Sequence, residues 1–284
     1  MSEHPQPEPS PLALRGVRAG YGERTVLHGI DLGVVPHGVT SVIGPNGCGK
    51  STMVRTMGRL LRPTAGDVLV DGRPIRTLST RDVARRIAVL PQSPLAPEVL
   101  TVADLAARGR QPHQPWYRQW STDDEQIVDG ALRLTQLTGL ADRPLEELSG
   151  GQRQRAWLAM VLAQQTPVIL LDEPTTHLDL AHAVEVLELV HRLAALEGKT
   201  VLLVLHDLGL AARYSDRLVV MKQGRIVTQG SPSEVLDDRL LADVFGLAAH
   251  VFPDPVDGLP TVVPARTPTA PALRSARPAA GGQD

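Results

Sequence analysis

Short apolar runs alternate with longer helical patterns along most of the chain. Several of these runs are continuously apolar, which is typical of strands that are covered on both faces. The alternation therefore predicts an α/β fold with a mostly parallel sheet, whose strand ends form the expected ligand site. The predicted strands cover residues 40–43, 67–70, 87–90, 168–171, 201–205 and 218–221.

Helical patterns are clearest in the second half of the chain. Residues 180–196 carry an apolar stripe with the 3.6-residue period of a helix. Residues 153–165 also predict a helix. By contrast, residues 93–148 lack a good core strand and contain helix-like segments at 102–109 and 122–137. We therefore expect residues 93–148 to form a helical insert in the α/β core.

Composition narrows the class of protein. A chain of 284 residues can hold one large domain or two small ones, and its 42% hydrophobic and 21% charged content is ordinary for a soluble globular protein. The longest apolar stretches fall far short of the roughly 20 residues that a membrane span needs. A net charge of −2 without a sustained basic run argues against a nucleic-acid partner.

The ends of the chain and its one cysteine indicate a compartment. The N-terminus is polar and rich in proline, which does not fit a secretory signal, and a single cysteine suits a reducing environment. We therefore expect a cytoplasmic protein that reaches a membrane only through a partner. Residues 1–11 and 265–284 are rich in Pro, Ala, Ser and Gly, and we expect them to be disordered tails.

A glycine-rich run follows the predicted strand at residues 40–43 and fits G-x-x-x-x-G-K-[ST], a pattern that binds nucleotide phosphates. Its glycines let backbone N–H groups face an anion, and the helix predicted at residues 52–61 adds the positive end of its dipole. Lys50 would reach the β- and γ-phosphates, and the Ser51 hydroxyl would hold Mg²⁺. The candidate nucleotide-binding residues here are Gly44, Pro45, Asn46, Gly47, Cys48, Gly49, Lys50, Ser51 and Thr52.

Two carboxylates follow the predicted strand at residues 168–171. A strand that emerges beside the phosphate loop can place Asp172 near Mg²⁺, usually through coordinated water. The adjacent Glu173 can orient or deprotonate an attacking water, which contributes about 10²–10⁴-fold to a rate.

A second anion-seeking helix start lies farther along the chain. Ser149 is a favoured N-cap residue, and Gly150 and Gly151 open the backbone before Gln152 and the predicted helix. One nucleotide hardly needs two such sites from one protomer. We interpret this as a dimer in which each chain contributes one helix start to each nucleotide site.

With these motifs, the chain resembles the nucleotide-binding subunit of an ATP-binding cassette (ABC) transporter over nearly all of residues 12–250. Residues 44–52 match the Walker A motif of the family and residues 168–173 its Walker B motif. Residues 148–152 match the signature sequence, which in the family faces the ATP of the partner subunit.

The resemblance implies roles for further residues. Gln92 matches the Q-loop, which senses Mg²⁺ and water and contacts the membrane subunit. Asp179, together with His177, fits the D-loop. His206 fits the switch histidine that contacts the γ-phosphate, and Tyr21 matches the aromatic residue that stacks on adenine.

The resemblance also implies the domain organisation. We expect an ABC ATPase domain over residues 12–264, with a P-loop NTPase core of RecA type and an N-terminal antiparallel β subdomain in residues 12–92 and 149–264. Residues 93–148 would be the helical subdomain. Two protomers would close over two ATP molecules, each with Mg²⁺.

Weaker signals point to a subfamily. Residues 107–113, 149–165, 174–179 and 254–263 are similar to those of iron–siderophore importers of the ferric-enterobactin type. This resemblance implies an ATPase on the cytoplasmic side of the inner membrane, with an integral permease and a periplasmic or lipoprotein substrate-binding protein as partners. The alternatives are a haem or vitamin B12 importer, an ABC exporter, or a soluble ABC protein that acts on nucleic acid.

Three side chains leave alternatives open. Arg108 and Arg110 belong either to a solvated helix end or to a surface that faces the permease. Cys48 is either a small side chain that fits its loop or a reactive thiol whose pKa is lowered by the nearby helix N-terminus.

Overall fold

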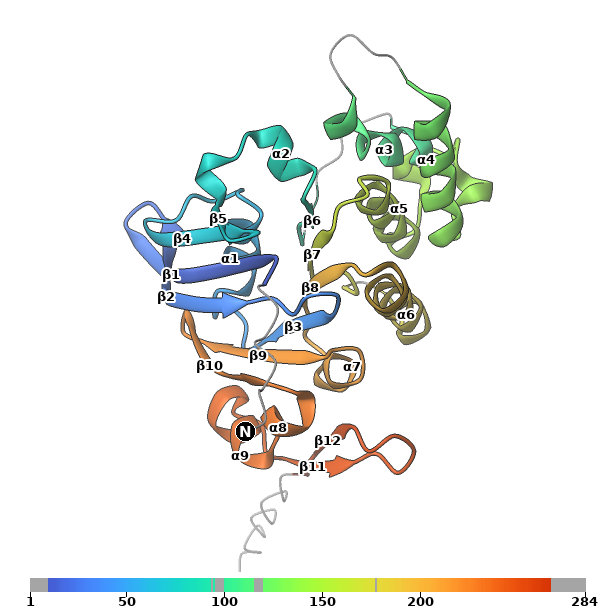
Figure 1. The fold of residues 1–284 in the computed structure, drawn as a ribbon. Helices are drawn as coiled ribbons and strands as arrows, with labels where there is room; N and C mark the ends of the chain where they lie inside the picture. Colours follow the sequence, from blue (N-terminus) through green and yellow to red (C-terminus); the bar gives the residue numbers. More distant parts are fainter. Residues whose placement is uncertain (1–9, 93, 95–99, 115–119, 177, 267–284) are drawn as a thin grey trace, which may run out of the picture.

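The computed structural model describes residues 10–92, 94, 100–114, 120–176 and 178–266. At its centre lies a six-stranded sheet in the order β10-β9-β3-β8-β7-β6 (Figure 1). The strands from β9 to β6 are parallel, and only β10 at the edge is antiparallel, which confirms the predicted α/β class. The strands are β3 (Val39–Ile43), β6 (Ile87–Leu90), β7 (Val168–Asp172), β8 (Thr200–Val204), β9 (Arg217–Lys222) and β10 (Arg225–Gly230).

A second, four-stranded sheet lies on one side of the central sheet and is entirely antiparallel. Residues 67–70, which we expected in the parallel sheet, belong to this one, so that prediction was wrong. Apolar periodicity identifies a strand but not its partner, and a tight turn at Asp71 and Gly72, both with positive φ, returns the chain antiparallel to itself. The strands are β1 (Leu12–Tyr21), β2 (Arg24–Gly33), β4 (Ala65–Val70) and β5 (Arg73–Pro74).

Helix α1 (Lys50–Met57) packs between the two sheets (Figure 1). Its Met53 and Met57 share one buried cluster with Leu14 of β1 and Leu170 of β7. The helix ends earlier than the expected residue 61. A glycine at position 58 closes it, and Arg59 adopts φ 60°, a left-handed conformation that ends helices.

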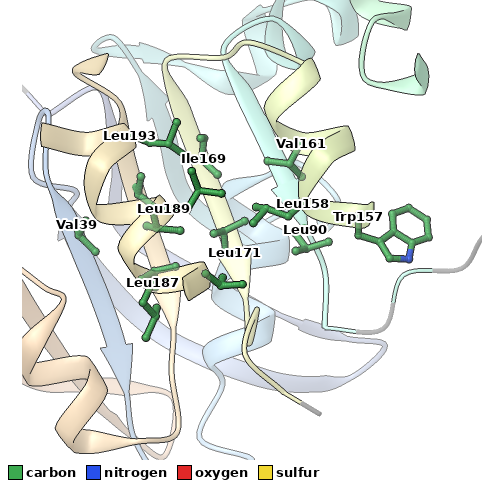
Figure 2. Close-up of a cluster of buried hydrophobic side chains, with 14 of the residues drawn as sticks. Val39, Leu90, Trp157, Leu158, Val161, Ile169, Leu171, Leu187, Leu189 and Leu193 are labelled. Atoms are coloured by element: carbon green, nitrogen blue, oxygen red, sulfur yellow. The ribbon is translucent and has the colours of Figure 1, made fainter. Parts of the chain in front are cut away.

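The other face of the central sheet is covered by α5 (Gly150–Ala163) and α6 (Leu180–Glu197). Figure 2 shows the cluster that forms there, with Ile169 and Leu171 of β7 between Leu158 of α5 and Leu187 of α6. The alternate β7 residues, such as Leu170, point to α1 instead. Both faces of β7 are therefore buried, which explains its unbroken apolar sequence.

The predicted insert is helical where it is described, with α3 (Val102–Arg108) and α4 (Thr122–Leu134) packed on each other and on α5. Both helices begin with a capping box, formed by Thr101 with Asp104 and by Ser121 with Asp124. Because α5 contacts α3 and α4 as well as β6, the subdomain boundaries at residues 93 and 149 stay a prediction.

Short elements complete the described part. Of the expected tails, only residues 10–11 and 265–266 fall within it; the rest lie outside. Among the described residues, no helix is both long and apolar enough to span a bilayer. The remaining elements are η1 (Ile75–Thr77), α2 (Thr80–Ala84), η2 (Gln111–His113), η3 (Thr138–Leu140), η4 (Leu145–Glu147), α7 (Leu208–Arg213), α8 (Pro232–Val235), α9 (Asp238–Leu240), η5 (Leu241–Phe245), β11 (Ala249–Pro253) and β12 (Pro260–Pro264).

Arg110 fits neither of the surface alternatives considered above, because its side chain is buried, whereas Arg108 is exposed. The Arg110 guanidinium lies 2.8 Å from the Asp124 carboxylate and donates to the carbonyl oxygen of Ala163 at 2.9 Å. Burial raises the pKa of Asp124, but hydrogen bonds from Arg110 and Ser121 outweigh it and hold that pKa below its usual range. Arg110, which follows α3, is thus joined to the start of α4 by the ion pair and to the end of α5 by the bond to the Ala163 carbonyl.

We expect Arg110→Ala to lower the free energy of unfolding by about 3–5 kcal/mol, because it leaves the Asp124 carboxylate buried without its partner. The matched surface change, Arg108→Ala, should cost less than about 0.5 kcal/mol. The pKa of the Asp124 carboxyl is lower in the folded state than in the unfolded state. The ionised carboxylate therefore adds to the free energy of unfolding above its unfolded pKa, and this stabilisation is lost as the pH falls through its folded pKa. Urea unfolding of both variants at neutral and acid pH measures these differences; equal losses for both arginines would contradict the expectation.

Candidate functional site

A pocket of about 690 Å³ opens at the carboxyl edge of the central sheet. Loops that follow β3, β6, β7 and β8 meet there, because parallel strands end at the same edge. The pocket unites most of the residues predicted from the sequence. It is lined by Tyr21, Arg24, Val26, Asn46, Gly47, Gly49, Lys50, Ser51, Thr52, Gln92, Glu173, Thr176 and His206.

The loop after β3 curls around the side chain of Lys50. The Lys50 ammonium donates to the carbonyl oxygens of Gly44 at 2.8 Å and Pro45 at 3.2 Å, and the residue is only 5% exposed. The curl requires glycine at two positions. A Cβ at Gly44 would lie 2.2 Å from the Met221 carbonyl oxygen, and Gly49 adopts φ 109° against Leu27. The loop therefore holds a cation and the first N–H groups of α1 at one place, which suits a phosphate.

Ser51 and Asp172 form the second part of the site. The Ser51 hydroxyl donates to Asp172 Oδ1 at 3.1 Å. Burial raises the pKa of Asp172; the Ser51 hydrogen bond and the charge of Lys50 oppose this shift, while the charge of Glu173 adds to it. A hydroxyl and a carboxylate are hard oxygen donors of the kind that Mg²⁺ prefers when phosphates and water complete its shell. No group of three or more His, Cys, Asp or Glu side chains suited to a metal occurs among the described residues.

Glu173 is the centre of a hydrogen-bond network. Its Oε2 accepts from Gln92 Nε2 at 2.7 Å and from the Thr176 hydroxyl at 3.2 Å, and its Oε1 lies 2.5 Å from His206 Nε2. Glu173 also adopts φ 57°, an uncommon conformation for a residue with a side chain, and is 7% exposed. Strained, over-determined backbone of this kind is typical of functional positions.

Tyr21 lies at the rim of the pocket, where β1 turns into β2. Its ring is 45% exposed, and the Arg55 guanidinium lies 5.8 Å from the ring centroid. The exposed ring can stack on a planar base.

Cys48 does not line the pocket. Its side chain belongs to the buried cluster around α1, and burial raises the pKa of the thiol against the opposing charge of Lys50. The hypothesis of a thiol with a lowered pKa was therefore wrong. The nearby helix N-terminus lowers the pKa of the Cys48 thiol by less than burial raises it, because the side chain faces the core and is largely out of contact with solvent. Gly44 and Pro45 do not line the pocket either, and they act on the site through the carbonyl oxygens that accept from Lys50.

Five of the predicted residues lie away from the pocket. Ser149 and Gln152 cap α5 reciprocally, each side chain accepting from the other's backbone N–H, and Gly150 and Gly151 lie between them. Asp179 caps α6, and the His182 backbone N–H holds the pKa of its carboxyl below the usual range. His177 lies outside the described residues. Within one protomer, the glycine pair and Asp179 thus add nothing to the pocket lining.

Three lining residues were missed by the sequence analysis. Arg24 and Val26 lie on β2, a strand that the apolar pattern did not reveal. Thr176 lies in the stretch 174–179, which was matched to a family as a block without a role for each residue. The only signal for Thr176 was its position three residues after the catalytic candidate Glu173, a spacing that a turn can bring into contact.

Comparisons with known proteins agree with this geometry. The family model described as "ABC transporter" matches residues 27–176. The petrobactin import ATP-binding protein FpuD of Bacillus anthracis is 47% identical over 253 residues, covering 89% of this chain and 93% of the relative. The ferric enterobactin transport ATP-binding protein FepC of Escherichia coli (strain K12) is 47% identical over 253 residues, covering 88% and 93%.

Among solved structures, the dimeric bacterial ABC transporter cassette MJ0796 is similar to the whole core. It superposes with a TM-score of 0.70 at 29% identity, covering 78% of this chain and 98% of that one. The family match, the two relatives and this structural likeness agree with the phosphate loop and Glu173 in the pocket and with Asp172, which lies behind Ser51 and outside the pocket lining. The chain belongs to the ABC transporter family, as an ATP-binding subunit with the ABC ATPase fold.

Proposed function

We propose that this protein is the ATP-hydrolysing subunit of a membrane importer and energises the uptake of a ferric siderophore. The observation that carries the ATPase assignment is the meeting of Lys50, Ser51 and Glu173 in one pocket at the edge of the parallel sheet. The cargo is inferred from relatives that are named for petrobactin import, ferric enterobactin transport and siderophore transport.

The phosphate loop would hold the triphosphate. Lys50 exchanges the Gly44 and Pro45 carbonyls for the β- and γ-phosphates, while the N–H groups of residues 47–52 surround the same anion. Tyr21 stacks on adenine from the rim. Ser51, Asp172 through water, and Gln92 would hold Mg²⁺, which neutralises phosphate charge.

Glu173 is the proposed general base. Its carboxylate is in the pocket, is held by its neighbours and can take the proton of a water that attacks the γ-phosphate. His206 and Gln92, which both contact this carboxylate, come from the ends of β8 and β6 and would position the γ-phosphate and the water. Lys50 supplies positive charge where the loose transition state carries its negative charge.

A second protomer would complete each site. The N-terminus of α5 is exposed at Ser149 and Gly150 and half-buried at Gly151, and the N–H groups of the two glycines, unlike those of Ser149 and Gln152, have no acceptor among the described residues. A phosphate bound by Lys50 of one copy can accept from this helix start in the other, and Asp179 would contribute from the same copy as the helix start. ATP then stabilises the closed pair, and hydrolysis removes that stabilisation, which is the differential affinity that can drive a transporter.

Coupling to transport would pass through the helical insert. Gln92, whose amide contacts Glu173, directly precedes that insert in the chain. We propose that the insert contacts an integral permease on the cytoplasmic side of the inner membrane. A periplasmic or lipoprotein substrate-binding protein would deliver the chelate to that permease. Nucleic acid is not a partner in this proposal.

We expect Glu173→Gln to lower ATP turnover by about 10²–10⁴-fold, because an amide cannot accept the proton of water. ATP binding should persist, and the closed dimer should accumulate, since the amide keeps the shape of the side chain. Phosphate release and size-exclusion chromatography with ATP measure both effects. Near-normal turnover would remove Glu173 as the base.

The composite site predicts complementation between inactive chains. Lys50→Ala removes the phosphate cation, and Ser149→Arg blocks the helix start on the facing protomer. Each variant alone should be nearly inactive, but a mixture should regain activity, because a mixed dimer keeps one site with both intact halves. A mixture as inactive as its components, or a fully active Ser149→Arg homodimer, would contradict a shared site.

Co-purification with the permease tests the transport function. In a reconstituted complex with its substrate-binding protein, ferric siderophores should stimulate ATP hydrolysis, while haemin and vitamin B12 should not. Stimulation by haemin or vitamin B12 alone would move the assignment to the alternative importers. Stimulation without any binding protein would favour an exporter, and a gel shift with nucleic acid would favour a soluble regulatory protein.

A further inference from the structure

Thr176 touches the carboxylate of the proposed base and has no role in the proposed mechanism so far. Its hydroxyl donates to Glu173 Oε2 at 3.2 Å, and its backbone N–H donates to the Glu173 carbonyl oxygen at 3.3 Å. The second bond closes a tight turn from Glu173 to Thr176. The local chain therefore brings the hydroxyl within reach of the carboxylate.

The other two groups on the carboxylate come from distant parts of the chain. Gln92 follows β6 and leads into the helical insert, and His206 follows β8. In the proposed mechanism, Gln92 would bind Mg²⁺, and Gln92 and His206 would position the water and the γ-phosphate. When they turn to those ligands, Thr176 is the remaining side chain on the carboxylate.

The geometry also leaves room for the water. A carboxylate offers about four lone-pair positions, and the three contacts use three of them. A hydroxyl on Oε2 limits rotation of the carboxylate plane, which keeps a free lone pair directed into the pocket. The backbone of Glu173 is already fixed by its N–H bond to the Val204 carbonyl oxygen at 3.2 Å, so χ rotation is the freedom that Thr176 restrains.

We propose that Thr176 is a positioning residue for ATP hydrolysis, which holds the Glu173 carboxylate in its base geometry through the hydroxyl bond to Oε2. The inference rests on the proposed function, since it requires Glu173 to be the base. It assigns to Thr176 an effect on the chemical step and none on nucleotide affinity, because the hydroxyl contacts the base and not the phosphate loop.

The test compares Thr176→Val, which keeps the shape but removes the hydroxyl, with Thr176→Ser, which keeps the hydroxyl. Thr175→Val is the matched control, since the adjacent Thr175 hydroxyl makes no bond to Glu173 among the described residues. Steady-state kcat and KM, the Kd for ATP and the thermal midpoint are measured for the full chain. We expect Thr176→Val to lower kcat about tenfold with KM and Kd within about twofold, as loss of one hydrogen bond to a charged group predicts. Thr176→Ser and Thr175→Val should stay near wild type.

A double-mutant cycle that combines Thr176→Val with Glu173→Gln distinguishes an effect on the position of the carboxylate from a general effect on folding. If Thr176 acts through the Glu173 carboxylate, Thr176→Val should lower the residual single-turnover rate of Glu173→Gln by less than about twofold. A further tenfold loss in that background, an equal loss in Thr176→Ser, or a rise in KM at unchanged kcat would overturn the proposal. So would wild-type kcat in Thr176→Val while Glu173→Gln is inactive. Wild-type turnover in Glu173→Gln would instead overturn the base assignment itself, and with it the proposed role of Thr176.

Discussion

The ammonium group of Lys50 is buried inside its own loop, and the candidate site depends on how that charge is compensated. Two carbonyl oxygens accept from it, and among the described residues no carboxylate lies within ion-pair distance. A buried charge without a counterion is costly, so the folded protein carries a site that an anion would stabilise. Two features hold this cation where a phosphate can reach it. One is the pair of glycines that permits the curl of the loop, and the other is the packing of α1 between the two sheets.

The two-sided burial of the central sheet explains why the proposed catalytic groups converge. Because β7 is covered by α1 on one face and by α5 and α6 on the other, its polar residues can only occur at its end, where Asp172 and Glu173 follow four apolar positions. The same logic places Gln92 after β6 and His206 after β8. The sheet thus sets both the order of these residues in space and their common position at one edge.

Much of this arrangement could be predicted from the sequence because it follows from local patterns. The phosphate loop, the strand before Asp172 and the capped start of α5 each have a signature within about ten residues, and the structure has all three elements. The wrong predictions concern long-range relations. The pairing of residues 67–70, the burial of Arg110 against Asp124 and the orientation of Cys48 into the core all depend on segments that meet only after folding. Helix dipoles and apolar periodicity carry no information on such contacts.

The same limit applies to the site itself. The sequence placed Glu173 next to Asp172, but it could not show that the Glu173 carboxylate is shared by Gln92, Thr176 and His206. In this structure the cation is held by carbonyls and the base is held by three donors, so each reactive group is occupied by the protein. In the proposed function, a triphosphate exchanges those contacts for its own, and the start of α5, which lies away from the pocket of its own protomer, donates to the nucleotide of a neighbouring copy. In the proposed function, a nucleotide and a second protomer are both needed to complete the site, which is the condition under which hydrolysis can be coupled to movement.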